Sequence, residues 1–151
     1  MRLLMVFLFA PMMLTAYGCK QKATQNLPNT IAQENVKDPY PFYIGGEGEL
    51  FYLGAAIEND TLYNVYNPIF KKHGYSGNGY SWEGHIEQIL EKVDNDLLHH
   101  IEFDAEAGAF FAQADSKESQ QRFVNILSPI FTDLPQLEAY LKKADRARII
   151  D

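Results

Sequence analysis

Two pairs of short apolar runs stand out when the chain is read for hydrophobic and polar positions. Residues 41–44 and 50–57 are rich in aromatic and apolar side chains, and only glycine and glutamate separate them. Residues 101–103 and 109–114 form a second pair around a turn that contains Gly108. Apolar runs of this length that flank a glycine-containing turn are typical of β-hairpins. We therefore predict two antiparallel hairpins.

Apolar residues recur at helical spacing in four other segments, which predicts four amphipathic helices. The recurring positions are Leu62, Val65, Tyr66, Ile69 and Phe70; Trp82, Ile86, Ile89, Leu90 and Val93; Phe123, Ile126, Leu127, Ile130 and Phe131; and Leu134, Leu137, Leu141 and Ala144. Hairpins grouped with helices, without regular β-α-β alternation, indicate an α+β fold. We expect a small antiparallel sheet of two hairpins packed against these helices.

Local residue chemistry refines where these helices begin and end. Pro68 and Pro129 lack a backbone donor, so the first and third helices should kink or end there, with Asn67 as an alternative cap. Ser81 is expected to cap the second helix, whose polar positions, including Gln88, should face water. Residues 94–100 are expected to add one further turn.

The first 18 residues follow a different pattern from the rest of the chain. Arg2 precedes an apolar run over residues 3–14, and small residues then lead to Cys19, as in a secretory signal. A permanent span needs about 20 apolar residues, and this run is shorter. Residues 19–38 are mostly polar, which is typical of a disordered tether. We therefore predict a signal peptide over 1–18, a tether over 19–38 and one domain over 39–151.

Cys19 is the single cysteine of the chain, which excludes an intramolecular disulfide. Its position after the apolar run resembles a bacterial lipoprotein signal, and that resemblance implies lipidation of Cys19. The protein would then be anchored to a membrane in the cell envelope, on the periplasmic side or at the cell surface. Lys20 in place of an aspartate favours the outer membrane. The alternative is an ordinary cleaved leader followed by a free thiol.

The net charge of the chain indicates which kinds of partner it could bind. The chain has a formal net charge of −7, and removing residues 1–18 takes away one basic residue, Arg2, and no acidic one. A nucleic-acid-binding domain should be basic, so the acidic balance argues against nucleic acid. It suits a basic protein partner, or simply solubility.

Two groups of residues could carry chemistry or binding. The glycine-rich loop over residues 74–83 could display Tyr75 and Tyr80 on a fixed backbone, although Tyr80 and Trp82 could instead pack the helix onto the sheet. Glu102, Asp104 and Glu106 would share one face if their strand continued that far. Paired carboxylates such as Asp104 and Glu106 can hydrolyse glycosides, but solvated charges or contacts for a basic partner are favoured.

The histidines do not have the spacing of a metal site. His99 and His100 are adjacent, so on a helix they point apart, and the other two histidines are isolated. The sequence therefore predicts no metal, no cofactor and no catalytic residue.

Two blocks of residues resemble immunity protein family 51 of bacterial polymorphic toxin systems. The matching residues are Gly77, Asn78, Gly79, Tyr80, Trp82 and Glu83, followed by Phe103, Asp104, Glu106, Ala107, Gly108 and Phe110. The resemblance covers roughly residues 42–144. It implies a non-enzymatic protein, encoded beside a toxin gene, that binds the cognate secreted toxin and blocks it. We expect the blocking to occur by occlusion of the toxin's active site.

Combined with the leader, the resemblance predicts neutralisation of a toxin in the cell envelope. We expect a preformed surface of tyrosines, an asparagine and carboxylates to bind the toxin, namely Tyr75, Asn78, Tyr80, Glu83, Glu102, Asp104 and Glu106. The alternative is an envelope lipoprotein that uses the same aromatic loop on peptidoglycan, a glycan or an envelope protein assembly.

Overall fold

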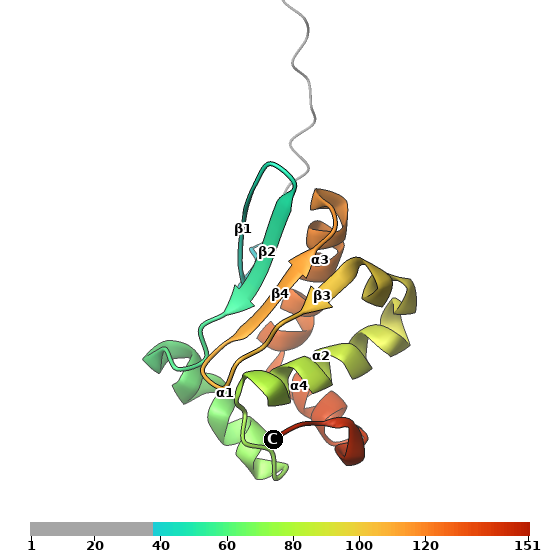
Figure 1. Ribbon diagram of the computed structural model, residues 1–151. Helices are drawn as coiled ribbons and strands as arrows, with labels where there is room; N and C mark the ends of the chain where they lie inside the picture. Colours follow the sequence, from blue (N-terminus) through green and yellow to red (C-terminus); the bar gives the residue numbers. More distant parts are fainter. Residues whose placement is uncertain (1–37) are drawn as a thin grey trace, which may run out of the picture. The chain divides into compact units, whose positions relative to one another are not determined.

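The computed structural model describes residues 38–151 (Figure 1). The predicted signal peptide, Cys19 and the predicted tether up to residue 37 lie outside the described residues. The elements, in chain order, are β1 (Tyr43–Glu47), β2 (Leu50–Ala55), α1 (Asp60–Lys72), α2 (Gly79–Val93), the 3-10 helix η1 (Asn95–His100), β3 (Ile101–Phe103), β4 (Phe110–Ala114), α3 (Lys117–Thr132), α4 (Leu134–Leu141) and the 3-10 helix η2 (Arg146–Arg148).

The strands form one antiparallel sheet in the order β1-β2-β4-β3 (Figure 1). Each predicted hairpin is present, as β1 with β2 and as β3 with β4. The two hairpins join through their central strands, where Leu53 pairs with Ala112 and Ala55 with Phe110. The predicted α+β fold is therefore confirmed.

The two faces of the sheet have different surroundings. Leu53, Phe110 and Ala112 alternate onto one face and are fully buried. Helix α3 contacts both β2 and β4 on this side, and α2 contacts β4. In Figure 1, α3 lies behind the central strands, and no helix of residues 38–151 crosses in front of β2 and β4. One sheet face is thus the floor of the core, and the other faces outward.

Trp82 lies at the centre of the core. Its side chain is fully buried, and its ring centroid lies 5.0 Å from that of Tyr66, 5.9 Å from that of Phe70 and 4.8 Å from that of Phe131. Each aromatic pair adds about 0.5–1.5 kcal/mol beyond the area that it buries. Trp82 therefore packs the start of α2 onto the core, which was one of its two predicted roles.

Both internal prolines lie inside continuous helices. Helix α1 runs through Pro68 to Lys72, and α3 runs through Pro129 to Thr132. The prediction that Asn67 begins a new helix is wrong, because its side chain instead donates to the carbonyl oxygen of Ser76 (3.1 Å). An internal proline costs about 3 kcal/mol, and fully burying a phenylalanine contributes about 1.5–3 kcal/mol. Phe70, which follows Pro68, is fully buried and offsets much of that cost.

Helix α2 begins earlier and is more buried than predicted. Its N-cap is Asn78 rather than Ser81, which is itself buried within the first turn. Val93, assigned to the apolar stripe, is 45% exposed, whereas Gln88 is only 5% exposed. The Gln88 amide exchanges two hydrogen bonds with the backbone of Asp145, so the chain end covers a position that helical periodicity alone assigns to water.

Within residues 38–151, no helix combines the length and the apolar character that crossing a bilayer requires.

Candidate functional site

Tyr75, the first residue of the predicted binding surface, is a core residue. It is 5% exposed, and its ring meets the His85 ring edge-on at 4.3 Å between centroids. The guanidinium carbon of Arg146 lies 4.5 Å from the centroid of the Tyr75 ring. These contacts cover the tyrosine from both sides. Tyr75 therefore does not lie on an accessible surface, in contrast to the prediction.

The Gly-Asn-Gly segment builds the start of α2. The Asn78 side chain accepts from the Ser81 N–H (2.8 Å), which satisfies one of the free donors at the helix start. Gly79 N–H donates to the carbonyl oxygen of Ala107 (3.1 Å), and a Cβ at Gly79 would lie 1.9 Å from the carbonyl oxygen of Glu106. The start of α2 is thus held against the β3–β4 connection by a contact that only glycine permits.

Glu83 strengthens the same connection. Its Oε2 accepts from the Ala105 N–H at 3.1 Å, and its side chain is half-buried. One oxygen of this predicted contact residue is therefore already engaged inside the protein. Tyr80, 38% exposed, remains accessible at the same helix start.

Glu102, Asp104 and Glu106 share one face of the β3–β4 hairpin, and we call them the acidic row. In the ladder, Glu102 pairs with Gln113. Two residues further on, the Asp104 N–H donates to the carbonyl oxygen of Phe111 (3.0 Å), and Glu106 forms an isolated bridge near the turn. Because the pairing keeps one register beyond β3, alternate side chains keep one orientation. All three carboxylates are exposed.

The outward face of the sheet carries apolar and aromatic side chains that sequence reasoning missed. The side chains of β1, β2 and β4 on this face, which we call the open sheet face, are Tyr43, Glu47, Leu50, Tyr52, Phe111 and Gln113. Tyr43 is 48% exposed and Leu50 is 44% exposed, and the rings of Tyr52 and Phe111 lie 5.7 Å apart. The sequence contained an indication of this face, because a strand with one solvent-exposed face should alternate apolar with polar residues. Here β2 is apolar on both faces, and β4 places Phe111 as well as Gln113 on the outward one.

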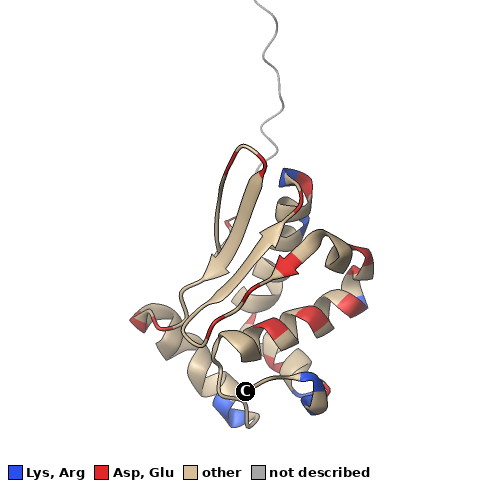
Figure 2. Cartoon of the chain, in the orientation of Figure 1, with Lys and Arg blue, Asp and Glu red and all other residues tan. Residues whose placement is uncertain are grey.

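Acidic side chains also line helix α2 beside the hairpin. Glu83, Glu87 and Glu91 recur every four residues, and Figure 2 shows acidic positions of β3, its connection and α2 on one side of the molecule. Burial, with Glu83 nearby, raises the pKa of Glu87. A hydrogen bond from Arg148 lowers the pKa of Glu91 (2.8 Å between Nη1 and Oε2). Of these three glutamates, Glu83 and Glu91 thus already have partners within the protein.

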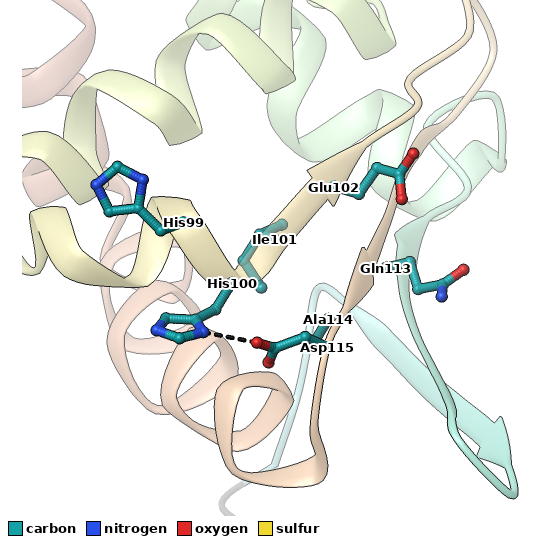
Figure 3. Close-up of a pocket in the computed structure, with 7 residues that line it drawn as sticks. All are labelled: His99, His100, Ile101, Glu102, Gln113, Ala114 and Asp115. Carbon is teal, nitrogen blue, oxygen red and sulfur yellow. Dashed lines mark hydrogen bonds and ion pairs between the residues drawn. The ribbon is translucent and has the colours of Figure 1, made fainter.

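A shallow depression of about 280 Å³ lies at the edge of the sheet between η1 and the end of β4 (Figure 3). On its wall, His100 Nδ1 lies 2.6 Å from Asp115 Oδ2. That hydrogen bond, together with one from Ser119, lowers the pKa of Asp115 to about 2, and the same contact raises the pKa of His100. Ser119 donates to the carboxylate rather than to the histidine (2.7 Å), so the group lacks the order of a nucleophilic triad.

No group of three His, Cys, Asp or Glu side chains within residues 38–151 is arranged to hold a metal ion. His73 contacts Glu138 (3.1 Å), and His85 is buried among aromatic rings. Each of these histidines therefore has a structural environment of its own.

Comparison with known proteins places these features in a family. The family model described as immunity protein 51 matches residues 55–146, which is more than half of the chain. No curated protein and no solved structure matches the chain. The matched region runs from the end of β2 to η2 and includes both the α2 start and the β3–β4 hairpin. The chain therefore belongs to the immunity protein 51 family.

Proposed function

We propose that this protein binds a cognate secreted toxin and neutralises it by covering the toxin's active site. Family membership carries the proposal, because an immunity family implies a toxin partner and is generally non-enzymatic. The toxin would be bound as a protein surface rather than turned over as a substrate.

The exposed carboxylates support a basic partner. Glu102, Asp104 and Glu106 project into solvent from one face, and the whole chain carries a net charge of −7. Charges of one sign on one side of a protein speed encounter with a partner of opposite sign. With Tyr80 beside them, the acidic row can contribute to an interface of standard size, about 1,600 Å² in total.

We further propose that the protein works from a membrane anchor at Cys19. The leader pattern of residues 1–18 and the single cysteine after it support lipidation. A protein anchored in the envelope can meet only toxins that arrive or act there, so a toxin that attacks the cell wall or the membrane is the expected target.

Genetics tests the proposal directly. Deleting this gene should harm a strain that carries the adjacent toxin gene or receives the toxin from its neighbours, and deleting the toxin gene should remove the harm. If loss of this gene remains harmful in a strain that meets no toxin, the immunity function is refuted.

Purified components give the second test. The toxin domain encoded by the adjacent gene should lose activity at a one-to-one ratio with residues 39–151, and substrate added in excess beforehand should slow the inhibition, because the two would compete for one site. An unchanged toxin activity at saturating concentrations of this domain would contradict active-site occlusion.

A further inference from the structure

The open sheet face is a largely apolar and aromatic surface that no helix of the described part of the chain covers. We propose that this face, with the acidic row along its edge, is the centre of the toxin interface and binds an arginine-bearing apolar surface of the toxin. The inference rests on the proposed immunity function, and it adds the location and the chemistry of the contact.

The aromatic side chains are held in place before any partner arrives. A Cβ at Gly54 would lie 2.2 Å from the end of the Tyr43 ring, so the ring can lie over this position because it has no side chain. Phe111 pairs with Gly54 in the ladder, and its ring lies 5.7 Å from that of Tyr52. Rings fixed in this way lose little freedom on binding, which favours them as centres of binding energy.

The acidic row gives this apolar face a preferred partner. Asp104 lies opposite Phe111 in the hairpin, and Glu102 lies opposite Gln113. Figure 3 shows Glu102 and Gln113 projecting to the same side from neighbouring strands. Side chains in opposite positions have Cβ atoms about 4.5–5.5 Å apart. A group that contacts the Phe111 ring can therefore reach the Asp104 carboxylate at the same time.

Arginine fits this pair of contacts better than lysine does. A guanidinium is planar, stacks on an aromatic ring and gives a carboxylate two parallel hydrogen bonds, whereas an ammonium is a compact, strongly hydrated charge. An arginine stacked on Phe111 with its edge toward Asp104 would use both groups. The remainder of the open sheet face would then cover apolar side chains beside that arginine.

Charge also argues against two other occupants. A second copy of this chain would bring a second acidic row to the same interface, and like charges in contact are repulsive. Nucleic acid would be repelled by the same carboxylates. A basic protein surface is the occupant that this combination of rings and carboxylates favours.

The test measures binding of the toxin domain encoded by the adjacent gene to the full mature chain and its variants. Tyr52→Thr and Phe111→Thr remove rings from the outward face while keeping residues that suit a strand. Each should weaken binding by at least about 10-fold, as expected for a residue at the centre of an interface. Asp104→Asn should weaken binding and reduce its dependence on salt.

Matched controls lie away from this face. Tyr63→Thr removes a tyrosine that is 45% exposed on α1, and Glu118→Gln neutralises an exposed carboxylate at the start of α3. Both should change affinity less than about 2-fold, within the usual range for residues outside an interface. Thermal unfolding of every variant shows whether a loss of affinity reflects a loss of folding.

The outcomes separate the surface from the function. If folded Tyr52→Thr, Phe111→Thr and Asp104→Asn proteins bind and inhibit the toxin like the wild type, the open sheet face is not the interface, although the immunity function stands. If the wild type does not bind the toxin, both proposals fail. Self-association that Phe111→Thr abolishes, or binding of peptidoglycan fragments to the same rings, would also overturn the inferred occupant.

Discussion

At the scale of single residues, the family-matching blocks mainly build the scaffold. Asn78 caps a helix, Gly79 permits a close backbone approach, Trp82 fills the core and Glu83 holds the neighbouring loop. The glycine-rich loop over residues 74–83, which could have displayed a binding surface, thus mainly fixes the start of α2 to the β3–β4 connection. The scaffold displays Tyr80 and Asp104 to solvent, and these are among the residues that we propose for partner contact.

Gly79→Ala should destabilise the domain by about 1–3 kcal/mol or more, although alanine is normally the better helix former. The added Cβ would lie 1.9 Å and 2.2 Å from two backbone oxygens of the β3–β4 connection, which cannot move as freely as a side chain. Urea unfolding measures the change. Gly45→Ala is the control, because its Cβ would meet nothing within 4 Å. Equal stability of the two variants would disprove the close contact.

His85 should make the domain sensitive to mild acid. Burial is the main cause that lowers its pKa from 6.5 to about 4, with smaller lowering effects from Arg146 and His73 and a raising effect from Asp151. Between these two pH values the unfolded chain binds a proton that the folded chain does not. Folding stability is therefore lost as the pH falls from 6.5 toward 4, by up to about 3 kcal/mol.

The measurement compares the free energy of unfolding of wild type and His85→Leu at a series of pH values. The difference between the two should change across pH 6.5 to 4, because only the wild type carries this buried group. The comparison with His85→Leu is needed because His100, whose pKa is raised, has the opposite effect: it stabilises the folded domain as the pH falls. Parallel profiles for wild type and His85→Leu would contradict the prediction.

At the scale of elements, the contact between α2 and the β3–β4 hairpin is the central joint of the described structure. Gly79 and Glu83 on α2 each bind backbone atoms of the connection between β3 and β4. That connection in turn carries Asp104 and Glu106 of the acidic row. Weakening the start of α2 should therefore disturb the surface that the hairpin displays.

Asn78→Ala should lower stability by about 1 kcal/mol, because the first turn of α2 loses its side-chain cap. Asn78→Asp should retain most of the stability, since a carboxylate also accepts from the Ser81 N–H and suits the helix start. Asn125→Ala, on the exposed side of α3, is the control and should change stability by less than about 0.5 kcal/mol. Thermal and urea unfolding measure all three. If Asn78→Ala matches the control, the cap does not contribute.

At the scale of the whole molecule, the domain has one sheet face packed on helices and one face with exposed rings beside carboxylates. A packed face alone would explain a stable domain. The second face, apolar where a wet sheet is usually polar, is better explained by a partner that covers it. In our proposal, its acidic edge would favour a basic partner over an acidic one.

Cys19→Ser should release the protein from the membrane fraction and abolish its labelling by palmitate, since the acyl chains would have no attachment site. A lipid chain contributes about 0.8 kcal/mol of membrane-binding free energy per buried methylene, so a protein without the chains should no longer stay at the membrane. Affinity for the toxin domain in solution should be unchanged, whereas protection of cells against an envelope toxin should fall. A Cys19→Ser protein that stays in the membrane fraction would contradict the anchor.

The sequence by itself determined the α+β class, both hairpins, the helical segments and the family. The elements could be predicted because they depend on local periodicity and turn chemistry, as with the runs that flank Gly108 and the stripe that includes Trp82. The family was indicated separately, by the resemblance of the residue blocks around Trp82 and Gly108. It also indicated that three acidic residues on alternate positions would share a face.

Only the tertiary structure decided which residues are accessible. Tyr75 is covered by His85 and by the distant Arg146, and Gln88 is covered by the chain end near Asp145, which is likewise distant in the sequence. Likewise, the two hairpins form one sheet through β2 and β4, and this brings Tyr52 beside Phe111. Burial and adjacency arise from contacts between distant segments, which a local pattern of residues does not encode.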